Sequence, residues 1–398
     1  MATSPAPAEP DFATLLRNEP FRLFFPLAFL LGAAGVSHWA LFAGGVITQY
    51  LGQFHAVSQM QSFLLAFACG FLLTALPKRT RTAPASWLEI AALGMLVPAV
   101  SLGALFDHLA LAEVAYLAAI GLLVQFAVRR FLGRAAGRRP PASFAAVPVG
   151  LFAGVIGAAL IIAADRGAPS WTHSLGKSLV LEGTFTGLVI GIGAFFFALA
   201  LRGEAAPDLT ASRRDIGRAS TYALAALLAL GGLVLQEIGR VREGVLLRAL
   251  IFTAVFVAAG AHRLPTRPGY NRRLIWLAGW AIPAGLLAAA IFPDHRVAAM
   301  HVAYIGGFGM MSHAVAAHVT LGHTGFDALQ GGKPWPVLVF GLLFLVAAGL
   351  RSTALLVPQI YFEWLGAAAI VWLTGVTVWA VFLLPKMWRA PAVSPQAP

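Results

Sequence analysis

Long apolar runs, separated by short gaps that hold most of the charge, are the feature of this sequence that most constrains its fold. A bilayer core about 30 Å thick is crossed by roughly 20 apolar residues in a helix. We find about twelve runs of that length, at residues 23–47, 56–76, 86–106, 109–130, 144–164, 178–201, 218–238, 243–262, 273–293, 296–319, 335–355 and 359–384. The pattern predicts an all-α fold, a polytopic integral membrane helix bundle.

The composition excludes a soluble globular domain. Of 398 residues, 59% are hydrophobic and only 11% are charged, whereas a soluble domain carries about 25% charged residues. The single cysteine, Cys69, lies in an apolar run and excludes disulfides and cysteine-based metal clusters within the chain. No P-loop, GxSxG or HExxH motif supports ATP hydrolysis or protease chemistry.

The positive charges lie mainly in alternate gaps. The net charge is +12, and most of the 28 Lys and Arg residues lie near the ends of the chain or in the gaps after the second, fourth, sixth, eighth and tenth runs. This asymmetry predicts that both termini are cytoplasmic. It also explains the excess of Lys and Arg over Asp and Glu without a nucleic-acid partner. We expect a cytoplasmic segment at 1–22, a membrane bundle at 23–389 and a disordered tail at 390–398.

Histidines are the most plausible chemical groups in this predicted bundle, because neutral imidazole binds copper, zinc and haem iron. On the expected topology His38, His55 and His301 fall in the outer half of the membrane, and His323 falls at the cytoplasmic end. The spacing of His55, Ser58, Gln59 and Ser62 puts them on one helical face, which we expect to turn towards the interior. The alternative is a polar helix end at the membrane interface.

A set of histidine and methionine side chains at the outer end predicts a haem or copper site. His38, His55 and His301, with Met300 beside His301, lie at the outer side of their runs, and thioether sulfur favours Cu(I). Histidines at helix ends without a metal are the alternative. Acids near the outer ends of the runs, such as Glu182, would suit a proton or substrate path, but we expect them to reach the membrane interface instead.

Three segments of the chain carry a family resemblance. The second run, from Phe54 to Pro77, is similar to a WHAHEM…GFLLTAVP segment without a gap. The tenth is similar to a segment that ends in LGHTG, and the chain's opening Pro20–Phe25 also fits. The matches in the tenth run are His301, Gly306, Gly309, Met311 and the final Gly322-His323-Thr324-Gly325. Together these segments resemble the NnrS family, haem- and copper-containing polytopic membrane proteins associated with nitric oxide metabolism in denitrifying bacteria.

The chain also departs from the family pattern. Val57 and Ser58 stand where the family usually has a second His and a Glu, and His318 stands where it has an Arg. The stretch 193–197 lacks the Arg of the family's GRVIPAFTR-like segment. Only His55, His301 and His323 carry over, so we identify the chain as a divergent member in which the number of haems or coppers is open.

The resemblance implies a protein of the bacterial inner membrane that binds haem, of b type, and copper in addition. It implies a role in nitric oxide or nitrosative-stress physiology and a respiratory redox partner. His55, His301, His38 and His323 are the expected cofactor-binding residues, and His55, His301 and Met300 are the expected metal ligands. Two other classes stay open: a secondary transporter without bound metal, and an assembly or interaction protein of a respiratory complex. The sequence does not tell whether the chain is an enzyme, or its oligomeric state.

Overall fold

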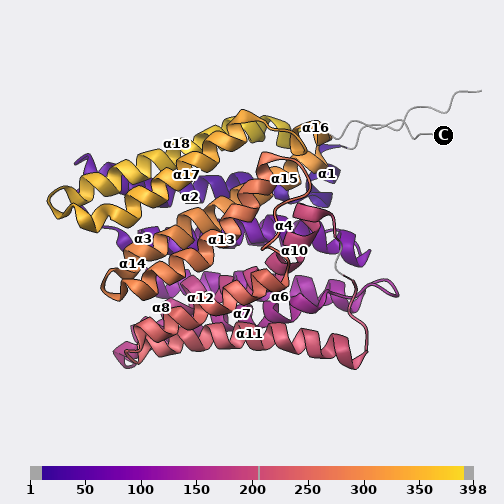
Figure 1. The fold of residues 1–398 in the computed structure, drawn as a ribbon, viewed down its shortest axis with the longest axis horizontal. Helices are drawn as coiled ribbons and strands as arrows, with labels where there is room; N and C mark the ends of the chain where they lie inside the picture. The colour runs from indigo at the N-terminus through magenta and orange to yellow at the C-terminus, as the bar shows by residue number, and fades with distance from the viewer. Residues whose placement is uncertain (1–10, 205–206, 390–398) are drawn as a thin grey trace, which may run out of the picture.

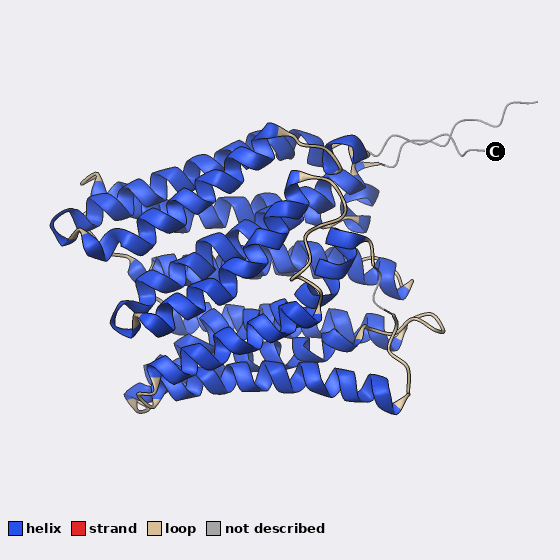
Figure 2. Cartoon of the chain, in the orientation of Figure 1, coloured by secondary structure: helices blue, strands red, loops and turns tan. Residues whose placement is uncertain are grey.

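The computed structural model describes residues 11–204 and 207–389, which form helices and loops with no strand among them (Figure 1 and Figure 2). This confirms the predicted all-α fold. The long helices run side by side, and their loops gather at two ends of the bundle. The predicted tail at 390–398 lies outside the described residues.

The first half of the chain contains α1 (Phe12–Asn18), α2 (Phe21–Ala43), α3 (Gly52–Val57), η1 (Ser58–Phe63), α4 (Leu64–Thr80), α5 (Trp87–Leu105), α6 (Leu109–Leu132), η2 (Ala142–Ala145), α7 (Ala146–Asp165), α8 (Ser170–Ser178), η3 (Leu179–Gly183), α9 (Thr184–Leu188), η4 (Val189–Gly193) and α10 (Ala194–Arg202). The second half contains α11 (Arg213–Glu237), α12 (Val241–Ala258), α13 (Tyr270–Ile291), η5 (Pro293–His295), α14 (Arg296–His301), η6 (Val302–Gly309), α15 (Met310–His323), α16 (Asp327–Gln330), α17 (Trp335–Thr353), η7 (Ala354–Leu356), η8 (Pro358–Ile360) and α18 (Tyr361–Met387). Several of these segments join into longer continuous helices, such as Gly52–Thr80 and Ser170–Arg202.

Ten helices of the described chain are long and apolar enough to cross a membrane. They coincide with ten of the expected runs, so a multi-pass membrane protein is confirmed. The other two runs are also helical, as α12 and as the continuous helix 296–323 formed by α14, η6 and α15, but they are not among the ten. The 18 residues of α12 include Arg242, Glu243 and Arg248. The count of twelve crossings stays a prediction.

The two ends of the bundle differ in which loops they hold. We call the end that holds both chain termini and loops such as 133–141 and 203–212 the termini end. Backbone hydrogen bonds join its loops, as from Leu209 N–H to the Pro140 carbonyl. The other end, which we call the distal end, holds loops 44–51, 106–108, 166–169, 238–240, 292–295 and 354–360. The first and last long helices, α2 and α18, pack against each other and join the two ends of the chain.

Three of the long helices contain π-helical turns, namely η1, η3 with η4, and η6. A π turn adds a residue to the helical turn and often marks a functional site. In η1 it turns Gln61 inward together with Ser58 and Ser62, and all three side chains are fully buried. The inward polar face predicted for this run is therefore confirmed, and the π turn enlarges it.

Two glycines of α2 let the π-helical segment η1 approach its backbone closely. A Cβ atom at Gly35 would lie 2.7 Å from the Ser58 Cβ and 2.8 Å from the Gln59 amide nitrogen. A Cβ atom at Gly32 would lie 2.8 Å from the Phe63 ring. This absence of side chains exposes the Gly32 and Gly35 carbonyls to side chains of the neighbouring helix, with consequences for the site described next.

Candidate functional site

A cavity of about 790 Å³ opens in the bundle at the distal end. This volume lies within the roughly 300–1,000 Å³ that is usual for cofactor and ligand pockets. Its walls come from α2, from the three helices that contain π turns, and from α17 and α18. Residues that line it and carry polar or sulfur atoms include His55, Gln59, Met60, Glu182, Glu237, Arg296, Met300, His301, Tyr304 and Arg351.

His55, at the start of the second long helix, is held so that one ring nitrogen stays free. Its Nδ1 lies 2.9 Å from the Gly35 carbonyl oxygen, which can only accept, so Nδ1 carries the hydrogen and donates it. The neighbouring Gln59 donates to the Gly32 carbonyl at 2.8 Å, and the Trp39 ring meets the imidazole edge-on with centroids 5.6 Å apart. The Nε2 atom of His55 therefore keeps its lone pair in a ring of fixed orientation.

His301, at the end of α14, repeats this arrangement from another wall of the cavity. Its Nδ1 donates to the Val297 carbonyl at 2.6 Å, and the Tyr304 ring lies edge-on with centroids 5.5 Å apart. A histidine that binds a metal almost always donates its other ring N–H to a carbonyl or carboxylate, which fixes the tautomer. Both cavity histidines have this arrangement, so their imidazoles fit ligation of haem iron or copper through Nε2.

Two methionines add soft donors to the same cavity. Met300 and Met60 line it, and both side chains are largely buried. The described residues contain no cluster of three or more His, Cys, Asp or Glu side chains that could hold a metal ion. A metal in this cavity would therefore rely on two imidazoles and a thioether, a donor set that suits haem iron or Cu(I). The structure thus brings His55, His301 and Met300 to one cavity.

The sequence analysis missed most of the charged groups around the cavity. Glu182 lines the wall and its carboxylate lies 2.5 Å from the Arg248 guanidinium, in a pair with side-chain exposures of 9% and 3%. The expectation that Glu182 reaches the membrane interface is wrong, because Arg248 of α12 provides a buried partner. The sequence signal for this ion pair was the presence of Glu182 and Arg248 within otherwise apolar runs. Arg351, from α17, was not considered as a site residue at all.

His38 lies behind the cavity rather than in its wall. Its Nε2 accepts a hydrogen bond from the Leu51 backbone N–H at 2.8 Å, and its ring packs edge-on against Trp39 with centroids 4.6 Å apart. The side chain is 2% exposed. His38 therefore positions the 44–51 loop and Trp39, which does line the cavity. Its role as a ligand stays a prediction.

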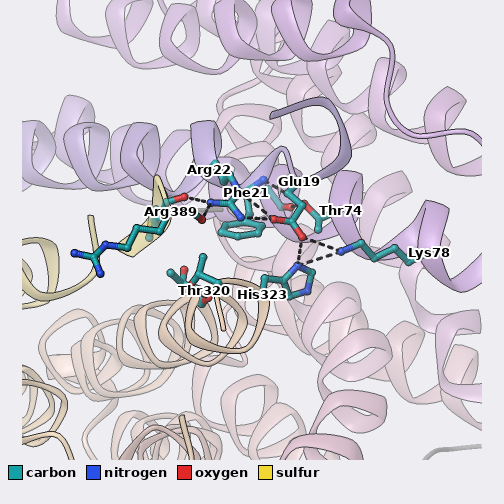
Figure 3. A network of polar contacts seen from close by, with 11 residues as sticks. Glu19, Phe21, Arg22, Thr74, Lys78, Thr320, His323 and Arg389 are labelled. Carbon is teal, nitrogen blue, oxygen red and sulfur yellow. Dashed lines mark hydrogen bonds and ion pairs between the residues drawn. The ribbon is translucent and has the colours of Figure 1, made fainter. Parts of the chain in front are cut away.

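His323 lies at the termini end, away from the cavity, in a network of charged groups (Figure 3). Its Nδ1 is 2.8 Å from a Glu19 carboxylate oxygen, and Lys78 Nζ is 3.1 Å from the same oxygen. The second Glu19 oxygen accepts from Arg22 at 2.5 Å, and Arg22 also donates to the Met387 and Arg389 carbonyls. The structure does not bring His323 together with His55 and His301.

The electrostatics of Glu19 explain why this network is stable. Burial disfavours the carboxylate, but the hydrogen bonds and charges of His323, Arg22 and Lys78 outweigh it and lower the pKa of Glu19 from 4.5 to about 2. The anion is thus shared by three basic groups from three separate helices. His323 acts here as a donor to Glu19, and its predicted cofactor role stays a prediction.

Two further histidines of the continuous helix 296–323 also lie apart from the cavity wall. His318 accepts from the Asn271 amide, with 3.0 Å between Nδ1 and Nδ2. His313 is fully buried among aromatic rings that include Phe63 and Trp372, and its Nδ1 donates to the Gly309 carbonyl at 2.8 Å. The histidines of this helix therefore do not converge on one site.

The fold and the cavity define a polytopic helical membrane protein with two imidazoles in the wall of one pocket at the distal end. The family model described as NnrS protein matches residues 15–390, so the chain belongs to the NnrS family. The comparison with functionally curated proteins finds no match. The family assignment made from the resemblance is therefore confirmed over almost the whole chain.

Proposed function

We propose that this protein binds haem in the distal cavity, with His55 and His301 as ligands, and acts in nitric oxide or nitrosative-stress physiology at the bacterial inner membrane. The observation that carries the proposal is the shared geometry of the two imidazoles. Each donates from Nδ1 to a backbone carbonyl and keeps Nε2 free in a cavity of about 790 Å³. Haem iron would supply one-electron redox chemistry at this position.

The residues around the imidazoles support the same occupant. The cavity wall is largely apolar and aromatic, with Trp39, Phe63, Tyr304 and Trp372, which suits a flat macrocycle. Membership of the NnrS family supports the link to nitric oxide, since the sequence resemblance implies that physiology. A respiratory redox partner belongs to the same proposal.

Copper is the alternative metal for the same donor atoms. Met300 and Met60 place thioether sulfurs in the cavity that holds both imidazoles, and such a mixed set favours Cu(I). Metal analysis of the protein purified from cells grown with copper tests it. About one copper per chain, lost in Met300→Leu, is expected, and a preparation that binds no copper would remove this part of the proposal.

The haem proposal is tested by the absorption spectrum of the full-length protein purified from haem-replete cells. We expect a Soret band that is lost in His55→Ala and in His301→Ala. His295→Ala is the matched control, because His295 is exposed just before the same helix and does not line the cavity. A colourless wild-type protein that also fails to bind added haem would reject haem binding. It would favour a transporter or an assembly protein instead.

A further inference from the structure

Arg351 is a cation of the cavity wall that has no acidic partner among the residues that the structure describes. It lies in the last turn of α17, within the apolar helix Asp327–Leu356, and lines the cavity that holds His55 and His301. Its side chain is partly buried. Within residues 11–204 and 207–389 it forms no ion pair, and its Nη1 atom is buried without a hydrogen-bond partner.

Three other charged groups of the cavity wall differ from Arg351, because each has a partner of matching chemistry. Lys177 and Asp107 also line the cavity, but both are exposed, so water solvates their charges. Glu182 pairs with Arg248 at 2.5 Å. Glu237 accepts from the Ser174 and Ser178 hydroxyls at 2.5 and 2.8 Å, and Arg296 donates to the Gln236 amide oxygen at 2.6 Å. The protein thus satisfies these groups internally, whereas Arg351 lines the cavity with its Nη1 atom unpartnered.

A buried guanidinium nitrogen without a hydrogen-bond partner is costly, because nothing replaces the water that it loses. A ligand with a negative charge would supply that partner. The planar guanidinium has parallel N–H donors that match the two oxygens of a carboxylate. Haem, which the two imidazoles of the same cavity would hold, carries two such carboxylates as its propionate groups.

We propose that Arg351 binds a carboxylate of the molecule in the cavity, which is a haem propionate if the proposed function holds. Arg351 is then a binding residue that sets the orientation of the ligand. His55 and His301 determine where the iron lies. The inference rests on the proposed function for the identity of the ligand, but its test also uses a porphyrin that contains no iron.

The experiment measures dissociation constants of three ligands for the full-length protein in detergent. The ligands are haem, metal-free protoporphyrin IX, and haem dimethyl ester, in which both carboxylates are masked. Variants are Arg351→Leu, Arg351→Lys and the control Arg240→Leu. Arg240 is an exposed arginine of the distal end that pairs with Glu243 and lies outside the cavity wall. Haem is followed by its absorbance and protoporphyrin by its fluorescence.

We expect Arg351→Leu to weaken haem and protoporphyrin binding by roughly tenfold or more. Arg351→Lys should retain part of the affinity, since it keeps the charge without the planar fork. The dimethyl ester should bind wild type and Arg351→Leu equally. Wild type should bind the ester more weakly than haem by the factor that Arg351→Leu causes for haem. This comparison uses the wild-type protein alone, so it does not depend on whether a variant folds.

The outcomes separate the two proposals. If wild type and Arg351→Leu bind haem equally, the Arg351 inference is overturned while haem binding stands. If protoporphyrin binding depends on Arg351 but haem binding does not depend on His55 or His301, ligation by the imidazoles fails and the carboxylate site stands. If wild type binds none of the three ligands, both proposals are wrong.

Discussion

The two ends of the bundle use histidine in opposite ways. At the termini end, His323 shares the Glu19 carboxylate with Arg22 and Lys78, and every charge in this network has a partner (Figure 3). At the distal end, His55 and His301 bond only to backbone carbonyls and face a cavity. A fixed ring with one free nitrogen is therefore not enough, since His313 has this arrangement too; a histidine becomes a candidate ligand when that ring also lines a cavity.

The largest expected effect comes from removing the buried ion pair in the cavity wall at the distal end. Glu182→Leu would leave Arg248 charged, buried and unpaired, which costs about 3–5 kcal/mol. Thermal unfolding in detergent measures this loss. The double variant Glu182→Leu/Arg248→Met should recover most of the stability, and equal stability of wild type and the single variant would show that the pair contributes nothing.

The second prediction tests whether histidines at the two ends of the bundle differ in haem binding. His55→Ala and His301→Ala should each weaken haem binding by about 100-fold, because a ligand is lost. His323→Ala should leave haem affinity unchanged, because its imidazole is engaged by Glu19. Titration of the purified variants with haem measures all three. A loss of haem in His323→Ala as large as in His55→Ala would place a cofactor at both ends.

The third prediction tests how the position of His55 is set. Gly35→Ala would add a methyl group 2.7 Å from the Ser58 Cβ, so α2 and the second long helix must separate. We expect a loss of stability of about 1–3 kcal/mol and a haem affinity that is lower by several-fold. Gly349→Ala is the matched control, since an added Cβ there meets nothing within 4 Å. Equal behaviour of both variants would contradict the role of this close approach.

The smallest expected effect concerns the termini end and its dependence on pH. Because the pKa of Glu19 is lowered from 4.5 to about 2, its contribution to stability is present above pH 4.5 and is lost as the pH falls towards 2. Glu19 keeps partial contact with solvent, so about 1–2 kcal/mol is expected. Unfolding temperatures of wild type and Glu19→Gln across this range measure it, and they should converge at the acidic end. Parallel curves would show that Glu19 is not the titrating group.

The sequence predicted the bundle because transmembrane helices depend on local composition. Each expected run is helical in the structure, and the inward face of Ser58 and Ser62 followed from their spacing. His55 and His301 could be chosen because the resemblance supplied them and their depth in the membrane agreed. His323 was chosen on the same resemblance, but the spacing could not reveal that Glu19 occupies its ring nitrogen.

The missed features depend on contacts between distant parts of the chain. Arg351 is far along the chain from His301 and farther still from His55, and only the folded bundle brings the three to one cavity. The apolar pattern does not show that Glu182 forms an ion pair with Arg248, or that Arg351 has no acidic partner among the described residues. The burial of Gln61 required the π turn, which an ideal helical period cannot predict.

The π-helical turns have a consequence for how such a cavity tolerates changes in chain length. Each residue added to a helix rotates all later residues by about 100°, so a single insertion absorbed in a π turn redirects one face while the rest of the helix keeps its contacts. In Gly52–Thr80, the segment Ser58–Phe63 separates the turn that carries His55 from the part near Thr80 that packs against α2. Removal of one residue from it would swing the imidazole away from the cavity without altering the rest of the helix, so the length of this segment matters as much as its composition.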